Sequence, residues 1–168
     1  MTSEPTKIYV SFNDIQNNVK TLANKIISSG IKYEAMIAIS GGGLIPARLL
    51  RTYLNIPIYC MGVSLYKGSV KQKHPIVTQS IGNKELDTIR ERHILIIDDL
   101  DDTRDTLAFV IKQLEIKYMT DFYIDVAVLY NKEKDNTAEL SNQVNYYCAK
   151  EIPNEWVVFP WDTDYIEQ

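Results

Sequence analysis

Apolar residues along the chain group in two ways. Some form short continuous runs, a pattern typical of strands buried on both faces of a sheet. Others recur every three or four positions, as on the inner face of an amphipathic helix. The two patterns alternate, which predicts an α/β protein with a mostly parallel twisted sheet flanked by helices. The runs lie at 35–39, 56–63, 93–97 and 124–130, with shorter strand patterns at 8–12, 146–149 and 157–159.

The stretches with helical spacing carry recognisable end signals. In the first, Asn13 or Asp14 could form the N-cap, and Gly30 could close the helix. Pro46 stands where a second helix could begin. A third stretch carries its apolar residues over 107–114.

Residues 66–92 fit neither pattern. They are rich in lysine, glycine and polar residues, and only 76–79 has the pattern of a strand. Such a long irregular stretch is uncommon inside a compact domain and is usually functional. The stretch is therefore either a functional lid or an element that the hydrophobic pattern fails to show.

Length and composition narrow the class of protein. The 168 residues indicate one domain over 1–168, and 45% hydrophobic with 24% charged residues is typical of a folded globular chain. The net charge of -4 argues against nucleic acid or an anionic membrane as the main partner. Cys60 and Cys148 have no metal-site or disulfide spacing. No apolar run approaches 18 residues, so we expect a cytoplasmic protein.

The strongest chemical signal follows the run at 93–97. Four carboxylates lie within 98–102, and cations, sugar hydroxyls or a proton-transfer task would explain them better than solvation alone. Residues 103–106 then open a helix, whose free N–H groups can bind an anion. A substrate with hydroxyls and a phosphate fits this order, although acids at a helix start are favourable without any ligand.

The same segment allows a second interpretation. Residues 99–103 fit a D-x-D-x-T pattern, which resembles haloacid-dehalogenase-like phosphatases. In those enzymes the first Asp attacks phosphorus and the second acts as acid or base. That pattern normally lies near the N-terminus, and the 65 residues after Thr103 are too few for the rest of the layout.

Ser40–Gly43 forms another loop rich in exposed backbone. Three glycines let an anion approach the amides closely, although a tight strand-to-helix turn would also explain them. The run matches neither a P-loop nor a G-x-G-x-x-G fingerprint. Two such loops beside a carboxylate cluster predict a ligand site at the carboxyl ends of the strands.

Several motifs carry a family resemblance. IIDDLDDTRDTL at 96–107 resembles the phosphoribosyl diphosphate (PRPP) motif of type I phosphoribosyltransferases, and AISGGGLIPARLLRTYL at 38–54 resembles their diphosphate-binding loop. The D-D-T-R core is similar to that of fungal-type hypoxanthine-guanine phosphoribosyltransferases. So are the S-L-Y run at 64–66, the V-L-x-x-K strand end at 128–132 and the IPxxWxxxPW tail at 152–161.

The resemblance covers about 9–164 and implies an activity. It implies transfer of phosphoribose from PRPP to N9 of hypoxanthine or guanine, with Mg²⁺ as cofactor. Asp102 would be the catalytic residue that takes the purine proton, and Tyr66 would ride on the lid. The resemblance implies PRPP binding by Ser40, Gly41, Gly42, Tyr66, Asp98, Asp99, Thr103, Arg104, Asp105 and Thr106, and purine binding by Lys132, Trp156 and Val157.

Some positions depart from the family pattern. Arg104 stands where most phosphoribosyltransferases have glycine, although the fungal branch shares the arginine. Asp105 would repel a bound phosphate unless its side chain points away. Within a small C-terminal hood over about 146–168, Asp162 is the candidate metal contact, and Asp164 is the second choice.

Two alternatives stay open on this scaffold. One is a xanthine-preferring enzyme, and the other is a non-catalytic nucleotide-sensing regulator that binds nucleic acid. The resemblance implies PRPP and a purine base as partners, and a homo-oligomer of two or four copies.

Overall fold

The computed structural model describes residues 6–67, 70–82, 84, 93–118 and 122–163. Its centre is a six-stranded sheet in the order β4-β3-β2-β5-β6-β7. All neighbours are parallel except β3 and β4, which confirms the predicted α/β class. The strands are β2 (Ala35–Ile39), β3 (Ile58–Lys67), β4 (Val70–Gln79), β5 (His93–Asp101), β6 (Tyr123–Lys132) and β7 (Tyr146–Ile152).

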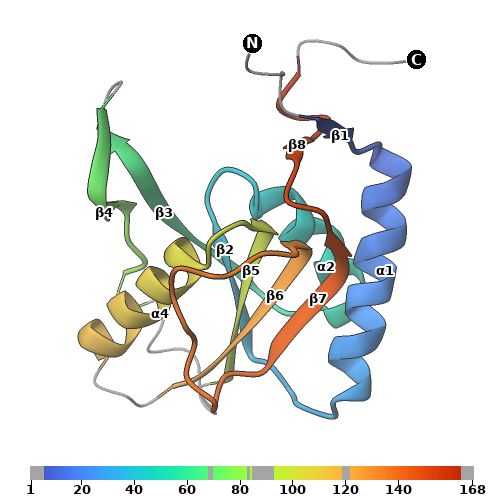
Figure 1. Cartoon of the computed structure of the whole chain (residues 1–168). Coiled ribbons are helices and arrows are strands. Elements are labelled where there is room, and N and C mark those ends of the chain that lie inside the picture. Colours follow the sequence, from blue (N-terminus) through green and yellow to red (C-terminus); the bar gives the residue numbers. More distant parts are fainter. Residues whose placement is uncertain (1–5, 68–69, 83, 85–92, 119–121, 164–168) are drawn as a thin grey trace.

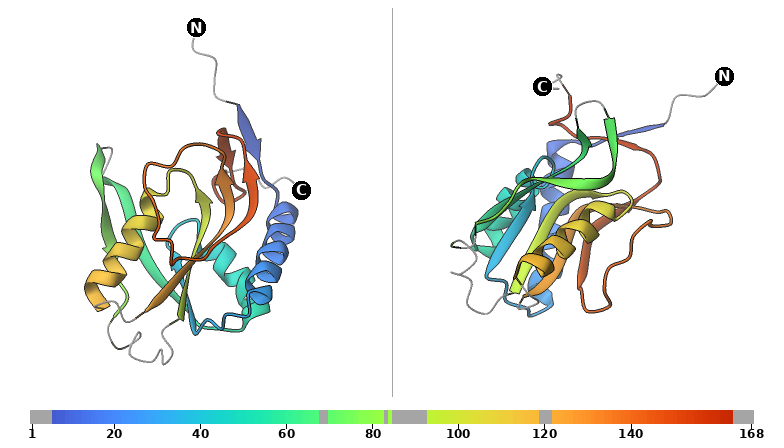
Figure 2. Two further views of the ribbon diagram at one scale, coloured as in Figure 1. Left: turned by 60° about the horizontal axis from the view of Figure 1, so that its bottom comes forward. Right: turned by 90° about the vertical axis from the view of Figure 1, so that its left-hand side faces the viewer.

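Helices cover both faces of this sheet (Figures 1 and 2). On one face lie α1 (Phe12–Ser28) and α2 (Leu44–Leu54), and on the other lies α4 (Asp105–Tyr118). Alternate residues of β5 serve the two cores: Leu95 and Ile97 pack with α1 and α2, whereas Ile94 and Ile96 pack with α4. No helix in the described part of the chain is long and apolar enough to cross a membrane.

The start of the chain differs from the prediction. β1 is confined to Lys7–Tyr9, and α1 is capped by Ser11 rather than by Asn13 or Asp14. The Asp14 amide donates to Ser11 Oγ at 3.1 Å, and the Ser11 amide donates to the Asp14 carboxylate at 3.0 Å. The acid therefore acts three residues inside the helix, as in a capping box.

β1 and β8 (Trp156–Val158) pair in parallel and form a separate two-stranded unit. The unit stands at the top of the molecule in Figure 1, beyond the carboxyl ends of the parallel strands. β7, by contrast, is an edge strand of the main sheet. Within the described part of the segment expected to form the hood, β8 belongs to the separate two-stranded unit and β7 to the main sheet.

The polar stretch after residue 65 contains more strand than the sequence predicts. β3 runs to Lys67 and pairs with β4 from Val70 to Gln79, where we expected a strand over 76–79 alone. Backbone pairing satisfies the peptide groups whatever the side chains are, so the hydrophobic pattern does not reveal it. Residues 83 and 85–92 lie outside the described residues, and a mobile lid stays a prediction.

Candidate active site

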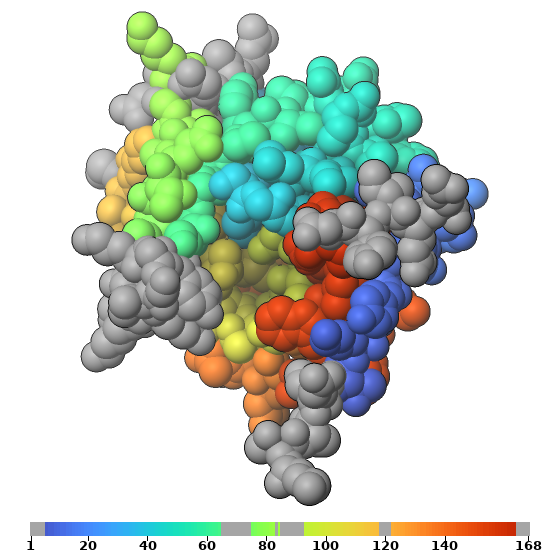
Figure 3. Space-filling view, turned by 90° about the horizontal axis from the view of Figure 1, so that it is seen from above, coloured from blue at the N-terminus to red at the C-terminus, as the bar shows by residue number. Residues whose placement is uncertain are grey.

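The candidate site lies where β2, β5 and β6 end at the same edge of the sheet. β2 pairs with β3 on one side and with β5 on the other, so the order in which strands are added to the sheet reverses between β2 and β5. Open α/β sheets bind ligands at such a switch point. Figure 3 looks onto this edge and shows a hollow. The yellow residues that end β5 lie at its base, between blue-green residues after β2 and red residues near the C-terminus.

The glycine loop after β2 comes directly against the acidic loop after β5. Gly41 has a φ of 100°, a conformation that glycine adopts without strain. A Cβ on Gly42 would overlap the whole carboxyl group of Asp99. The structure therefore brings together two of the predicted segments, and the contact explains why residue 42 has no side chain.

Asp98 and Asp99 are both largely removed from solvent. Asp98 is buried, and its Oδ1 accepts from the Asp99 amide at 3.0 Å. Burial, reinforced by the charge of Asp99, raises the pKa of Asp98 well above its ordinary value. Burial also raises the pKa of Asp99, and the nearby charge of Asp162 adds to it. A cation bound beside these two acids would favour their charged forms.

Asp102 faces two lysines at the end of β6. Lys132 Nζ lies 3.0 Å from Asp102 Oδ1, and Lys134 Nζ contacts the same oxygen. Burial disfavours the charged carboxylate, but hydrogen bonds from Lys134 and Lys132 outweigh it and lower the pKa of Asp102. Asp102 is thus held as a charged carboxylate against the two lysines.

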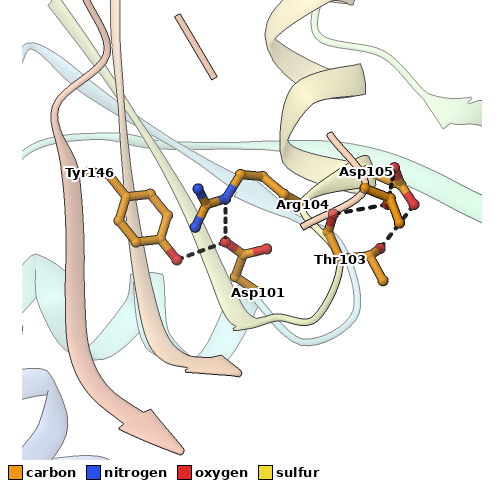
Figure 4. A network of polar contacts seen from close by, with 6 residues as sticks. Asp101, Thr103, Arg104, Asp105 and Tyr146 are labelled. Carbon is orange, nitrogen blue, oxygen red and sulfur yellow. Dashed lines mark hydrogen bonds and ion pairs between the residues drawn. The ribbon is translucent and has the colours of Figure 1, made fainter. Parts of the chain in front are cut away.

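The Asp105 side chain points toward Thr103 and Thr137. Thr103 Oγ1 donates to Asp105 Oδ2 at 2.9 Å (Figure 4). Thr137 Oγ1 donates to Asp105 Oδ1 at 2.8 Å. The Thr137 amide also donates to the Thr103 carbonyl at 3.1 Å. These contacts engage the carboxylate, so it need not oppose a phosphate held by the backbone of 103–106. Thr106 stands in the first turn of α4 and is partly buried.

Arg104 points toward Asp101 and Tyr146. Its Nε donates to Asp101 Oδ2 at 2.8 Å, and the Tyr146 hydroxyl donates to the same oxygen at 2.7 Å (Figure 4). The guanidinium carbon lies 4.6 Å from the centre of the Tyr146 ring. Asp101 is 1% exposed, so this ion pair is sheltered from solvent on the carboxylate side.

The residues expected to meet the purine come from β6 and from the C-terminal segment. Lys132 is only 8% exposed, whereas Trp156 is 61% exposed and its ring is open to a ligand. Val157, the next residue, is buried. Nearby, the rings of Phe159 and Trp161 stack with their centres 4.8 Å apart.

Asp162 lies just past this segment and is partly fixed by the backbone. The Phe159 amide donates to its Oδ2 at 3.4 Å. Its charge acts on Asp99, so the two carboxylates share one region. Tyr66 lies in β3 with its side chain outside the described part, and Asp164 lies outside the described residues.

The sequence alone did not single out Lys134, Thr137 or Tyr146. Each comes from the segment after β6 or from the start of β7, and each contacts the acidic loop. A second lysine two residues past the end of β6 was the available signal for Lys134. Thr137 and Tyr146 carried no local signal, because only the fold brings them to 101–105.

Comparison with known proteins agrees with this geometry. Residues 9–168 match the family model described as the phosphoribosyl transferase domain. The chain is 32% identical to xanthine phosphoribosyltransferase 1 of Saccharomyces cerevisiae, covering 99% of this chain and 94% of that protein. It is also 32% identical to the hypoxanthine-guanine phosphoribosyltransferase of Schizosaccharomyces pombe, covering 98% and 93%.

A solved structure is similar as well. It is that of a hypothetical protein from Neisseria gonorrhoeae with bound ppGpp. The TM-score is 0.83 at 34% identity, covering 96% of this chain and 92% of that one.

An α/β fold with a glycine loop and an acidic loop at its switch point is typical of proteins that bind a phosphorylated ligand there. The chain belongs to the phosphoribosyl transferase family.

Proposed function

We propose that the chain is a purine salvage phosphoribosyltransferase that uses a 6-oxopurine, hypoxanthine or guanine. In the reaction, purine N9 bonds to C1′ of PRPP, the bond from C1′ to the diphosphate oxygen breaks, and diphosphate leaves. The purine N–H proton passes to Asp102. The observation that carries the proposal is Asp102, next to the loop expected to cradle the 5′-phosphate and held by Lys132 at 3.0 Å.

The remaining roles follow from the chemistry of each group. The amides of Ser40, Gly41 and Gly42 would hold the diphosphate, and the backbone and hydroxyls of Thr103 and Thr106 would hold the 5′-phosphate. The backbone of Arg104 and Asp105 belongs to the same cradle. The amide contacts of the glycine loop would stabilise the charge that develops on the departing diphosphate. β3 and β4 form an antiparallel pair, here called the β3–β4 arm. Tyr66 on this arm would help exclude water, which would otherwise hydrolyse PRPP.

Lys132 would donate to the purine 6-oxo group once the base arrives, leaving Lys134 on Asp102. The exposed Trp156 ring would stack on the purine, and the Val157 carbonyl would meet its far edge. A 6-oxo group accepts from a lysine, whereas a 6-amino group is itself a donor. Adenine should therefore be a poor substrate.

Mg²⁺ fits the carboxylates present. Asp98 and Asp99 would hold it together with the sugar hydroxyls, and Asp162 is a further contact, supported by its charge acting on Asp99. The described residues offer no set of three metal-ligating side chains, so substrate and water oxygens would complete the shell, as Mg²⁺ prefers. When bound, the ion would neutralise the diphosphate as it leaves.

An absorbance assay with PRPP and Mg²⁺ tests the function. Hypoxanthine, guanine, xanthine and adenine are compared in parallel, with Asp102→Asn as the matched inactive variant. We expect turnover of hypoxanthine or guanine, little turnover of adenine, and a drop of about a hundredfold or more in Asp102→Asn. Turnover of xanthine alone would favour the xanthine-preferring alternative, because a relative of that activity is equally identical to this chain.

A second candidate function is nucleotide sensing, favoured by the ppGpp-bound neighbour. We propose that ppGpp, with its guanine base and diphosphate groups, competes with PRPP for the hollow at the sheet edge. Competitive inhibition against PRPP is expected, and ppGpp binding without turnover of any base would favour a pure regulator. Salt-dependent binding of RNA or DNA would extend that role.

The oligomeric state and the cellular location stay predictions. We expect a dimer or tetramer, which light scattering checks, and a cytoplasmic location, which cell fractionation checks.

A further inference from the structure

Residue 104 has an unusual backbone conformation for an arginine. Its φ is 68°, in the left-handed region that L-residues with a Cβ disfavour. The only other non-glycine residue with positive φ in the described part of the chain is Asn55, at the C-cap of α2, where that conformation is common. Arg104 has no such cap position, because α4 begins immediately after it.

The Arg104 side chain is anchored on the two strands that flank β6, namely β5 and β7. Asp101 Oδ2 accepts from Arg104 Nε at 2.8 Å and from the Tyr146 hydroxyl at 2.7 Å, and the guanidinium lies over the Tyr146 ring. Asp101 precedes the loop in β5, and Tyr146 starts β7. Figure 4 shows the three side chains pointing toward one another. The left-handed residue is therefore fixed to two strands of the rigid sheet.

We propose that Asp101, Arg104 and Tyr146 form a positioning triad that keeps the phosphate loop, 102–106, in its binding shape. The inference rests on the proposed function. A glycine at 104 would adopt the left-handed conformation freely but would also adopt others, so the unliganded loop would sample more shapes. The anchored arginine removes that freedom before the ligand arrives, and pre-organisation of this kind improves binding.

The triad acts on ground state and transition state alike, because the 5′-phosphate does not change during the reaction. Loss of such uniform binding raises KM and leaves kcat unchanged. A merely structural role would lower the amount of folded enzyme, and hence the apparent kcat, without changing KM for PRPP. The split between the two constants thus separates positioning from stability.

The variants are Arg104→Gly, Tyr146→Phe and the double variant Asp101→Val with Arg104→Gly. Arg104→Gly leaves a buried carboxylate unpaired and should lower Tm, whereas the double variant removes that charge and should regain Tm. We expect KM for PRPP to rise about tenfold in both, with kcat within about twofold of wild type. Tyr146→Phe should show a smaller rise in the same direction. Asn55→Gly, the other left-handed position, is the matched control and should keep the wild-type KM.

Binding of inosine 5′-monophosphate and of inosine provides a readout that needs no turnover. The ratio of their dissociation constants reports the phosphate contribution, and we expect the double variant to lose about tenfold of it. A folded double variant with wild-type KM and a wild-type ratio overturns the triad. Wild-type protein that turns over no base contradicts the proposed function instead, and the binding ratio still tests the triad.

Discussion

The carboxyl group of Asp99 occupies the space that a side chain on Gly42 would need. The two residues belong to different loops, one after β2 and one after β5, and these strands are hydrogen-bonded neighbours. The contact couples the loop expected to hold diphosphate to the acid pair expected to face ribose and Mg²⁺. A change at one residue should therefore disturb both substrate contacts.

Gly42→Ala should separate these two loops. A methyl group at residue 42 overlaps the Asp99 carboxyl group, which must move. We expect kcat/KM for PRPP to fall at least about tenfold, which corresponds to about 1.4 kcal/mol. Steady-state kinetics on the folded variant provides the measurement.

Gly30→Ala is the matched control for that substitution. Gly30 has a φ of 74°, and nothing lies within 4 Å of its Cβ position. Its replacement should cost about 1 kcal/mol of stability through backbone strain and leave the kinetics unchanged. Equal kinetics in both variants would contradict the coupling of Gly42 to Asp99.

Lys134→Met should raise the pKa of Asp102. The lysine contacts Asp102 Oδ1 and helps to hold the carboxylate charged against burial. A lowered pKa stabilises the fold above the unfolded-state value, and this contribution disappears as pH falls through the folded-state pKa. The variant should therefore lose less stability than wild type between about pH 5 and pH 3.

NMR titration of the Asp102 carboxyl carbon measures this pKa directly. Lys25→Met is the control, because Lys25 bonds to the Cys148 carbonyl instead of an acid. An Asp102 midpoint that Lys134→Met leaves unchanged would show that Lys132 alone sets it.

Asp98→Asn should stabilise the unliganded protein while impairing its function. Burial raises the pKa of Asp98, so the folded state holds that proton more tightly than the unfolded state. Stability is then lost as pH rises from the unfolded-state pKa through the folded-state pKa. Asparagine removes this loss, and we expect a gain of about 1 kcal/mol at pH 7, or roughly 2–4 °C in Tm.

Asp14→Asn should change the stability in the opposite direction and lower it. Hydrogen bonds from Ser11 lower the pKa of Asp14, so its charge stabilises the fold at pH 7. Urea unfolding of both variants should give shifts in opposite directions, and PRPP affinity should fall only in Asp98→Asn. Destabilisation by Asp98→Asn would mean that the Asp98 charge already has a compensating partner.

Trp156→Ala should weaken binding of the purine and leave binding of PRPP unchanged. The ring is exposed, so its loss should cost the fold little. Stacking on a base contributes about 1–3 kcal/mol, which predicts a rise of roughly tenfold in the purine KM. Trp161→Ala is the contrasting variant, since that ring stacks on Phe159 and its removal should lower Tm. A wild-type purine KM in Trp156→Ala would remove Trp156 from the site.

The sequence predicts the strands of the parallel core because those runs are buried on both faces. Ile94 to Ile97 pack alternately into the two cores, and no polar residue interrupts the run. The β3–β4 arm escaped prediction because backbone pairing, and not apolar periodicity, holds its polar strands. The N-cap at Ser11 was missed because Phe12, apolar and alternating with Val10, continued the strand pattern.

Similar reasons explain which residues of the candidate site the sequence suggests and which it does not. Ser40, Gly42, Asp99 and Asp102 could be proposed as site residues from the sequence because their chemistry is concentrated in two short loops at strand ends. Tyr146 and Thr137 could not, since each lies more than 30 residues from the loop that it contacts. The outward exposure of Trp156 also needed the fold, because a tryptophan near a C-terminal strand is more often part of the core.

The most direct test of the account is simultaneous measurement of nucleotide formation and diphosphate release from PRPP with hypoxanthine or guanine. Wild type should form one nucleotide for each diphosphate released. Asp102→Asn should lose about a hundredfold or more in kcat while it keeps the wild-type KM for PRPP. Diphosphate release without nucleotide formation, or unchanged kcat in Asp102→Asn, would contradict the assignment of Asp102 as the group that takes the purine proton.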